Sequence, residues 1–138
     1  MRVGMVRRLG ACRRGVSAIE MALVLTLFLG FVFGVINVSL VLWTQASLYF
    51  AAQAAARCAS ASPSVCGAPA SSALVEAYAL NQYTGQSLGG ANPFRYSASG
   101  CGHTVTASYP YPLSIPFYGD YLLSLSANAC FPAGGSTG

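Results

Sequence analysis

The sequence carries very little charge. Charged residues make up 7 % of the 138 residues and hydrophobic residues 54 %, whereas an ordinary soluble domain has about a quarter charged residues. Lysine is absent, and most of the formal net charge of +4 comes from arginines in the first fourteen residues. A nucleic-acid-binding protein would spread its cations along a groove or a helix face. The composition therefore argues against such a protein and indicates that much of this chain lies outside water.

Groups that could perform catalysis are also scarce. There is one histidine, His103, close to Cys101, and the acids beyond residue 60 are Glu76 and Asp120. We interpret His103 as a polar residue at a strand end, Cys101 as a disulfide cysteine and the two acids as solvated surface groups. No glycine-rich phosphate loop follows a strand, so we expect neither enzymatic activity nor a cofactor. Structural zinc sites favour closely spaced cysteine pairs, which the four later cysteines do not form, and no metal is expected.

One long apolar segment dominates the chain. Residues 21–56 contain no charged residue, and their core is MALVLTLFLGFVFGVINVSLVLW. About 20 such residues span a bilayer as a helix. A cleavable secretory signal, with its apolar region of about 7–15 residues, would be shorter, and AQAAARCASA is the only stretch where such a signal could be cut. A soluble product starting near residue 57 would establish that alternative.

The charge distribution predicts three parts and an orientation. We expect a basic leader over residues 1–15, a transmembrane helix over 16–59 and a small exported domain over 60–138. Because cations cluster before the helix and are almost absent after it, the positive-inside rule places the N-terminus in the cytoplasm and the C-terminus outside the inner membrane. The alanine-rich end of the helix should extend past the bilayer and pack on the exported domain.

The exported domain is predicted to be α+β. Residues 60–70 read as a loop, and residues 71–85 as a short helix that Ser71 or Ser72 caps and Gly85 ends. Alternating residues then predict strands in HTVTASY and YLLSLSANAC, with an edge strand at 94–97. The prolines between them (Pro110, Pro112 and Pro116), with Gly119, predict a long turn.

The four cysteines after the helix predict two disulfides. If Cys101 opposes Cys130 in an antiparallel pair, their numbers sum to 231, and the same register sets Val105 against Ser126 and Ala107 against Ser124. This pairing closes the open end of the hairpin and leaves Cys58 and Cys66 to tie the helix end to the next loop. Four cysteines in a small exported domain are typical of a disulfide framework.

The most informative residues lie where the leader meets the helix, in RRGVSAIE. This junction resembles the processing site of type IV prepilins, which a prepilin peptidase cuts after the glycine. The resemblance places cleavage between Gly15 and Val16. A carboxylate at the edge of an apolar helix is costly unless it is paired. Cleavage would create an α-amine on Val16, and Glu20 of one subunit could pair with that amine on a neighbour during assembly. The alternative is that Glu20 only stabilises the first helical turn.

Within that class, the chain resembles the TadE-like family of tight-adherence pilus systems. The resemblance rests on RRGVSAIEMALVLTLFLGFVFGVINVS, on QASLYFAAQAAARCA and on the late segments VTASYPYPL and LSLSANAC. Many Tad pilins have an aromatic residue after the glutamate, where this chain has Met21. The resemblance implies a minor pilin or pseudopilin whose partners are the prepilin peptidase, other pilins and the inner-membrane assembly platform.

The sequence is compatible with two further interpretations. An uncleaved, single-pass membrane-anchored binding or adhesion module would have the same layout. The aromatic residues around the predicted turn either pack the core of the domain or form a tip for adhesion or for docking another pilin; they are Tyr109, Tyr111, Phe117, Tyr118 and Tyr121.

Overall fold

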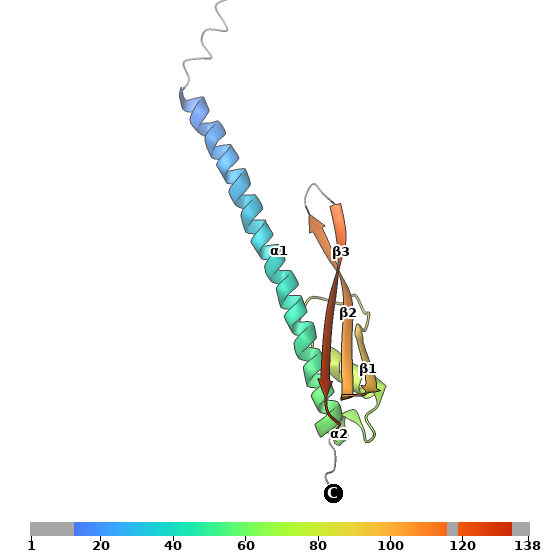
Figure 1. The fold of residues 1–138 in the computed structure, drawn as a ribbon. Helices are drawn as coiled ribbons and strands as arrows, with labels where there is room; N and C mark the ends of the chain where they lie inside the picture. The colour runs from blue at the N-terminus through green and yellow to red at the C-terminus, as the bar shows by residue number, and fades with distance from the viewer. Residues whose placement is uncertain (1–12, 116–118, 134–138) are drawn as a thin grey trace, which may run out of the picture. The chain divides into compact units, whose positions relative to one another are not determined.

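The computed structural model describes residues 13–115 and 119–133 (Figure 1). Its elements in chain order are α1 (Arg13–Ala61), α2 (Pro63–Cys66), α3 (Ser72–Gln82), β1 (Phe94–Ser99), β2 (Gly102–Ile115) and β3 (Gly119–Phe131). A long N-terminal helix with short helices and one antiparallel sheet confirms the predicted α+β fold. The chain divides into two compact units within α1, between Val38 and Ser39.

The long helix exceeds its predicted bounds at both ends. It begins at Arg13 instead of residue 16 and ends at Ala61 instead of residue 59. Ser62 breaks the helix with φ −128° and ψ 72°, because the ring of the following proline disfavours helical geometry at the preceding residue. The loop predicted over residues 60–70 is therefore interrupted by the single turn of α2.

The C-terminal third of α1 supplies one wall of the core of the second unit. Its buried side chains recur at helical spacing: Leu48, Ala51, Ala52, Ala55 and Ala56. Such spacing forms one apolar stripe along a helix. The stripe belongs to the same cluster as buried residues of the sheet, among them Val105 and Ala127. The predicted packing of the helix end on the small domain is confirmed.

The sheet has the order β1-β2-β3, with antiparallel neighbours. The register predicted from the cysteines is wrong: Val105 opposes Ala129 and Ala107 opposes Ala127. Directly opposed residues share one face of a sheet, so the predicted register would have placed serines among the buried apolar side chains. The observed register instead brings apolar residues of both strands onto the buried face, and Cys130 opposes Thr104.

The long turn predicted from the prolines is also wrong. Pro110 and Pro112 lie inside β2, which continues to Ile115, and β3 resumes at Gly119. Proline cannot donate to a ladder, but β1 pairs with β2 only as far as Ala107. The backbone N–H of Ser108 donates to Pro93 on the β1 side. Because backbone nitrogens two residues apart lie on the same side of a strand, those of Pro110 and Pro112 lie on the β1 side as well. Beyond Ala107, β1 no longer pairs with β2 there, so no ladder hydrogen bond is lost.

The short helix also ends earlier than predicted. Ser71 occupies the N-cap position without a side-chain cap bond, and the chain leaves the helix at Tyr83. Gly85 is therefore not the helix stop. A Cβ at Gly85 would overlap the Tyr83 ring, so the glycine makes room for that side chain where the loop turns back.

Candidate assembly and processing site

The predicted processing site lies in the first turn of α1. Arg13, Arg14 and Gly15 have helical backbone, so the Gly15–Val16 peptide is helical in this structure. The rest of the predicted leader, residues 1–12, is outside the described residues. Glycine is about 1 kcal/mol less favourable than alanine inside a helix. Gly15 thus lowers the helix propensity of the first turn of α1, where cleavage is predicted.

Val16 and Glu20 lie on one face of α1, one helical turn apart. Residues four apart stack along a helix, with a rise of about 6 Å between them. Val16 is 68 % exposed, and Glu20 is exposed as well. No ion pair or hydrogen bond of the Glu20 carboxylate occurs within the described residues. The structure thus presents the carboxylate outward, at the start of the apolar segment.

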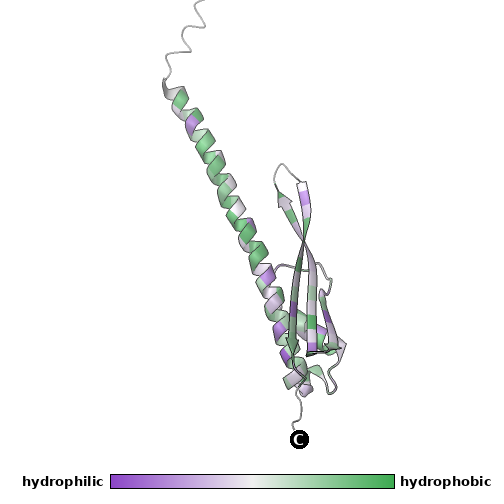
Figure 2. Cartoon of the chain, in the orientation of Figure 1, coloured by the Kyte–Doolittle hydropathy of each residue, from purple (hydrophilic) through white to green (hydrophobic). Residues whose placement is uncertain are grey.

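The first half of α1 after Glu20 is mostly hydrophobic, whereas hydrophilic residues recur toward the C-terminal end of the helix (Figure 2). Its large side chains are exposed around the whole circumference, including Met21, Leu27, Phe31 and Leu42. A helix that is apolar all round is suited to a membrane or to a fully enclosed position. With a mean hydropathy of 2.4 over its most apolar part, the stretch Val16–Ala61 is long and apolar enough to cross a membrane.

The polar side chains of this segment are satisfied within the helix itself. The Thr26 hydroxyl donates to the carbonyl of Ala22 at 2.8 Å, and the Asn37 amide donates to the carbonyl of Phe33 at 2.8 Å. An unsatisfied polar group in hydrocarbon costs several kcal/mol. Bonding to the carbonyl four residues earlier removes much of that cost, so these residues are compatible with a membrane span.

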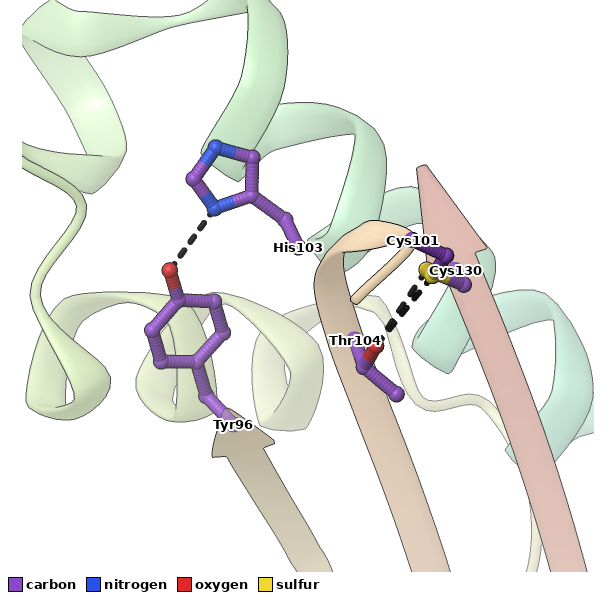
Figure 3. The surroundings of a disulfide bond; sticks show 5 residues. All are labelled: Tyr96, Cys101, His103, Thr104 and Cys130. Carbon is purple, nitrogen blue, oxygen red and sulfur yellow. Dashed lines mark hydrogen bonds between the residues drawn. A yellow bond between two sulfur atoms is a disulfide. The ribbon is translucent and has the colours of Figure 1, made fainter. Parts of the chain in front are cut away.

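The structure pairs the four later cysteines as Cys58–Cys66 and Cys101–Cys130. The Cα atoms are 6.0 Å and 6.5 Å apart, respectively, which is within disulfide reach. Cys101 lies in the turn between β1 and β2, so it reaches Cys130 diagonally. Thr104 lies between them and donates its hydroxyl to the Cys130 sulfur at 3.2 Å (Figure 3).

His103 does not form a catalytic pair with Cys101. Its Nδ1 lies 2.7 Å from the hydroxyl of Tyr96, and the two rings stack with centroids 5.9 Å apart (Figure 3). The sulfur of Cys101 is held in the pair with Cys130. In the part of the chain that the structure describes, no three His, Cys, Asp or Glu side chains gather as a metal site.

Sequence reasoning missed the role of Glu76. Its Oε1 accepts a hydrogen bond from the backbone N–H of Tyr96, and its Oε2 lies 3.5 Å from Arg95. The Glu76 side chain is 20 % exposed, so it is not the solvated surface acid that was predicted. A helical acid followed by a separate edge strand leaves no local pattern in the sequence that would reveal this contact.

The loop after α3 is held against α1 by polar bonds. The backbone N–H of Thr84 donates to the hydroxyl of Ser47 at 2.9 Å, and the Trp43 indole donates to the carbonyl of Thr84 at 3.4 Å. Burial raises the pKa of the Tyr83 phenol above its ordinary value of 10.0; Tyr109 also raises it, and the Thr44 hydroxyl works against the rise.

The aromatic residues around the predicted turn separate into two groups. Tyr111 is buried in the core and Tyr109 is half-buried beside it, with the two rings in edge-to-face contact. Tyr121 is 52 % exposed near the end of the hairpin. Phe117 and Tyr118 lie outside the described residues. The core-packing interpretation therefore holds for Tyr111, and an exposed aromatic position remains at Tyr121.

Comparison with known families identifies the helix. Residues 15–57 match the family model of the TadE-like protein. This part of the chain is therefore similar to TadE-like proteins. The matched residues include Gly15, Val16 and Glu20 and end just before Cys58, whereas the sheet lies outside them. No curated protein and no solved structure matches the chain. The TadE-like family is structural and points to a pilin-like subunit associated with a Tad pilus.

Proposed function

We propose that this protein is a minor pilin or pseudopilin of a Tad-type pilus, cut by a prepilin peptidase between Gly15 and Val16. One observation carries the proposal. The TadE-like match begins at Gly15, and an exposed carboxylate follows five positions later, where an apolar helix begins. A free carboxylate at the edge of such a helix is costly in a membrane. A partner cation at the same depth would remove that cost.

The newly formed N-terminus supplies the cation. Cleavage leaves an α-amine on Val16, which is positively charged at neutral pH. In a bundle of parallel helices, the amine of one subunit pairs with Glu20 of its neighbour. The pair sets the axial register between the two helices. An unprocessed subunit lacks this amine and is therefore expected not to assemble.

The arginine distribution supports an inner-membrane position with a cytoplasmic N-terminus. Five arginines precede Gly15, and the next one in the sequence is Arg57. Cations close to a span favour the cytoplasmic side. The paired cysteines lie after the helix, in the part that this orientation exports. Disulfides form and persist in such oxidising compartments.

A minor role is favoured because a small domain follows the helix. The assembly platform, the peptidase and a major pilin are the implied partners. The domain adds surface on which subunits can recognise one another. This surface is additional to the pairing of helices through Glu20.

The experiment is the intact mass and N-terminal sequence of the protein from native membranes. The wild type should start at Val16, and Gly15→Ala should retain its leader. Gly30→Ala is the matched control, because a Cβ at Gly30 meets nothing within 4 Å and the substitution lies within the span. It should be processed normally. A Glu20→Gln variant should be cut but should not enter a pilus.

An intact leader on the wild-type protein would overturn the proposal. The chain would then be an uncleaved, single-pass anchored binding module. A soluble product that begins near residue 57 would instead identify the apolar segment as a removed signal.

A further inference from the structure

The second compact unit contains a groove at the C-terminal end of α1, away from the apolar segment. Its volume is about 370 Å³. Sites for small ligands usually enclose about 300–1,000 Å³, so the groove suits a small ligand or a short stretch of a polymer. The lining combines aromatic and polar side chains, chiefly Phe50, Gln53, Arg57, Ser62, Tyr78 and Phe131.

The aromatic rings of the groove come from three elements. Phe50 lies on α1 and is 60 % exposed, whereas Tyr78 on α3 and Phe131 at the end of β3 are half-buried against the core. An aromatic ring offers a flat apolar face. Rings that are already held by the core lose little side-chain freedom when a ligand covers them. The groove therefore favours a ligand that also has a flat apolar face.

The polar side chains of the groove have unused hydrogen-bonding capacity. The side chains of Gln53, Arg57, Ser62 and Tyr78 make no hydrogen bond or ion pair within residues 13–115 and 119–133. A guanidinium supplies five N–H donors, and an amide or a hydroxyl both donates and accepts. The groove thus presents one positive charge together with several neutral donors and acceptors.

The polar wall of the groove is fixed by bonds in the α1–α2 connection. Cys58 also lines the groove and is paired with Cys66. The backbone N–H of Ser62 donates to the carbonyl of Cys58 at 2.9 Å. Gln53 and Arg57 are four residues apart and lie on one face of α1. These groups are positioned before a ligand arrives, which reduces the entropic cost of binding.

This mixed lining selects against purely apolar ligands and against nucleic acids. A lipid chain or an apolar peptide face would remove water from Gln53, Ser62 and Arg57 without replacing its hydrogen bonds, which is costly. A nucleic acid is held mainly by several cations along its phosphates, whereas the charged residue that lines this groove is Arg57. One cation beside flat apolar rings instead matches a ring that carries one carboxylate.

We propose that the groove binds an acidic sugar, a hexuronate unit of a polysaccharide. The Arg57 guanidinium pairs with the sugar carboxylate through two parallel N–H···O bonds. The C–H face of the sugar ring packs on the exposed ring of Phe50. Gln53 and Ser62 exchange hydrogen bonds with the sugar hydroxyls. A sugar presents both an apolar face and many hydroxyls, so it uses both kinds of side chain in the groove.

This site goes beyond the proposed pilin function. In the proposed orientation the groove belongs to the exported domain, so it would let a subunit contact polysaccharide outside the inner membrane. The site depends on the folded domain and does not require cleavage of the leader.

The test is calorimetric titration of the full chain, in a detergent that has no sugar head group. The probes are oligosaccharides of glucuronate, galacturonate and mannuronate. Their methyl esters keep the rings and remove the charge. At least one acid should bind saturably, with one site per chain, and its ester should bind roughly tenfold or more weakly, because a charge-assisted hydrogen bond is lost.

Two substitutions separate the charge from the ring. Arg57→Gln should weaken binding of the acid roughly tenfold and leave the weaker binding of the ester unchanged. Its control is Arg95→Gln, because Arg95 is also exposed but lies outside the groove. Phe50→Ala should weaken binding of both the acid and the ester. Its control is Tyr49→Ala, since Tyr49 is 49 % exposed and does not line the groove. Thermal melting checks that each variant folds.

Four outcomes would overturn the sugar site. They are failure of every acid to bind, equal binding of an acid and its ester, an unchanged affinity in Arg57→Gln or Phe50→Ala, and equally tight binding of a glutamate-containing peptide. The last outcome would assign the groove to a protein partner.

The mass of the chain is read in the same samples. A mature chain that starts at Val16 but binds none of the acids would overturn the sugar site alone. Binding by a chain that keeps its leader would support the sugar site and overturn the proposed processing.

Discussion

The Glu76 carboxylate on α3 accepts a hydrogen bond from the backbone N–H of Tyr96 on β1, at 3.1 Å. In the pairing with β2, Tyr96 points its N–H away from the ladder, toward the free edge of the sheet. At the same edge, the N–H of Phe94 donates to the side chain of Asn92 at 3.0 Å. Two polar side chains thus cover donors that an exposed edge strand would offer to other chains.

Replacing Glu76 should test this covering role. Glu76→Ala should lower the free energy of unfolding by roughly 1–3 kcal/mol, because the Tyr96 N–H is left without its partner. Glu76→Gln keeps an acceptor and should cost less. Chemical unfolding of the full chain in detergent, followed by near-ultraviolet circular dichroism, measures both. Arg95→Ala is the control and should change little, because Arg95 is 70 % exposed. An equal loss in Arg95→Ala would show that the ion pair matters instead.

The two cysteine pairs should differ in their resistance to reductant. Cys66 is fully buried and Cys58 is 6 % exposed, whereas Cys101 and Cys130 are exposed. The outer pair should therefore be reduced first. Alkylation during a time course of reduction, read by peptide mass, gives the order. Loss of the inner pair before the outer one would contradict the burial seen in the structure.

Removal of either disulfide should lower the free energy of unfolding. The loss should differ between the two disulfides. The sequence separations are 29 residues for Cys101–Cys130 and 8 for Cys58–Cys66. In the chain-entropy model, the longer loop contributes roughly 3–4 kcal/mol and the shorter roughly 2–3 kcal/mol. Paired serine substitutions, compared by chemical unfolding, test this. Cys12→Ser is the control and should have no effect on the folded domain.

Gly102 should not tolerate a side chain. Its φ is +122°, and a Cβ there would overlap the backbone of Phe131 and Ala133. Gly102→Ala should therefore lower the free energy of unfolding by at least about 2 kcal/mol. Gly100→Ala is the matched control in the same turn, because a Cβ at Gly100 meets nothing within 4 Å. Equal melting temperatures for the two variants would contradict the close approach of the Phe131 and Ala133 backbone to Gly102.

Stability should fall above about pH 10 through Tyr83. Burial raises the pKa of its phenol above 10.0 in the folded state, so the unfolded chain releases this proton first. Unfolding is then favoured as pH rises through the unfolded-state pKa, until the folded phenol also ionises. Below that range both states are protonated and Tyr83 adds no pH dependence. Tyr83→Phe should flatten the alkaline decline in melting temperature, and an unchanged decline in this variant would contradict the role of the buried phenol.

Local sequence was sufficient where one element depends mainly on its own residues. The apolar segment after Glu20 is helical and is exposed around its circumference. Its few polar side chains do not draw the backbone out of the helix. Thr26 and Asn37 bond to carbonyls of their own helix. The same local information placed the start of α3 at Ser71 or Ser72 and located the alternating residues of β2 and β3.

Local sequence failed where the answer depended on a second strand. Pro110 and Pro112 read as turn residues, yet they lie in a strand because β1 stops pairing at Ala107. The cysteine spacing suggested a register that set Val105 against Ser126. Requiring buried residues to share a face would have excluded that register from the sequence alone.

The sequence by itself determined the apolar helix, the basic residues before it, the glycine–glutamate junction and the α+β composition, because each depends on residues close together in the chain. Only the tertiary structure decided the strand register and the contact of Glu76 with Tyr96. Those features arise from residues far apart in sequence, whose positions are set by packing the small side chains of α1 against the sheet. Packing of that kind is a property of the assembled core and has no local signature.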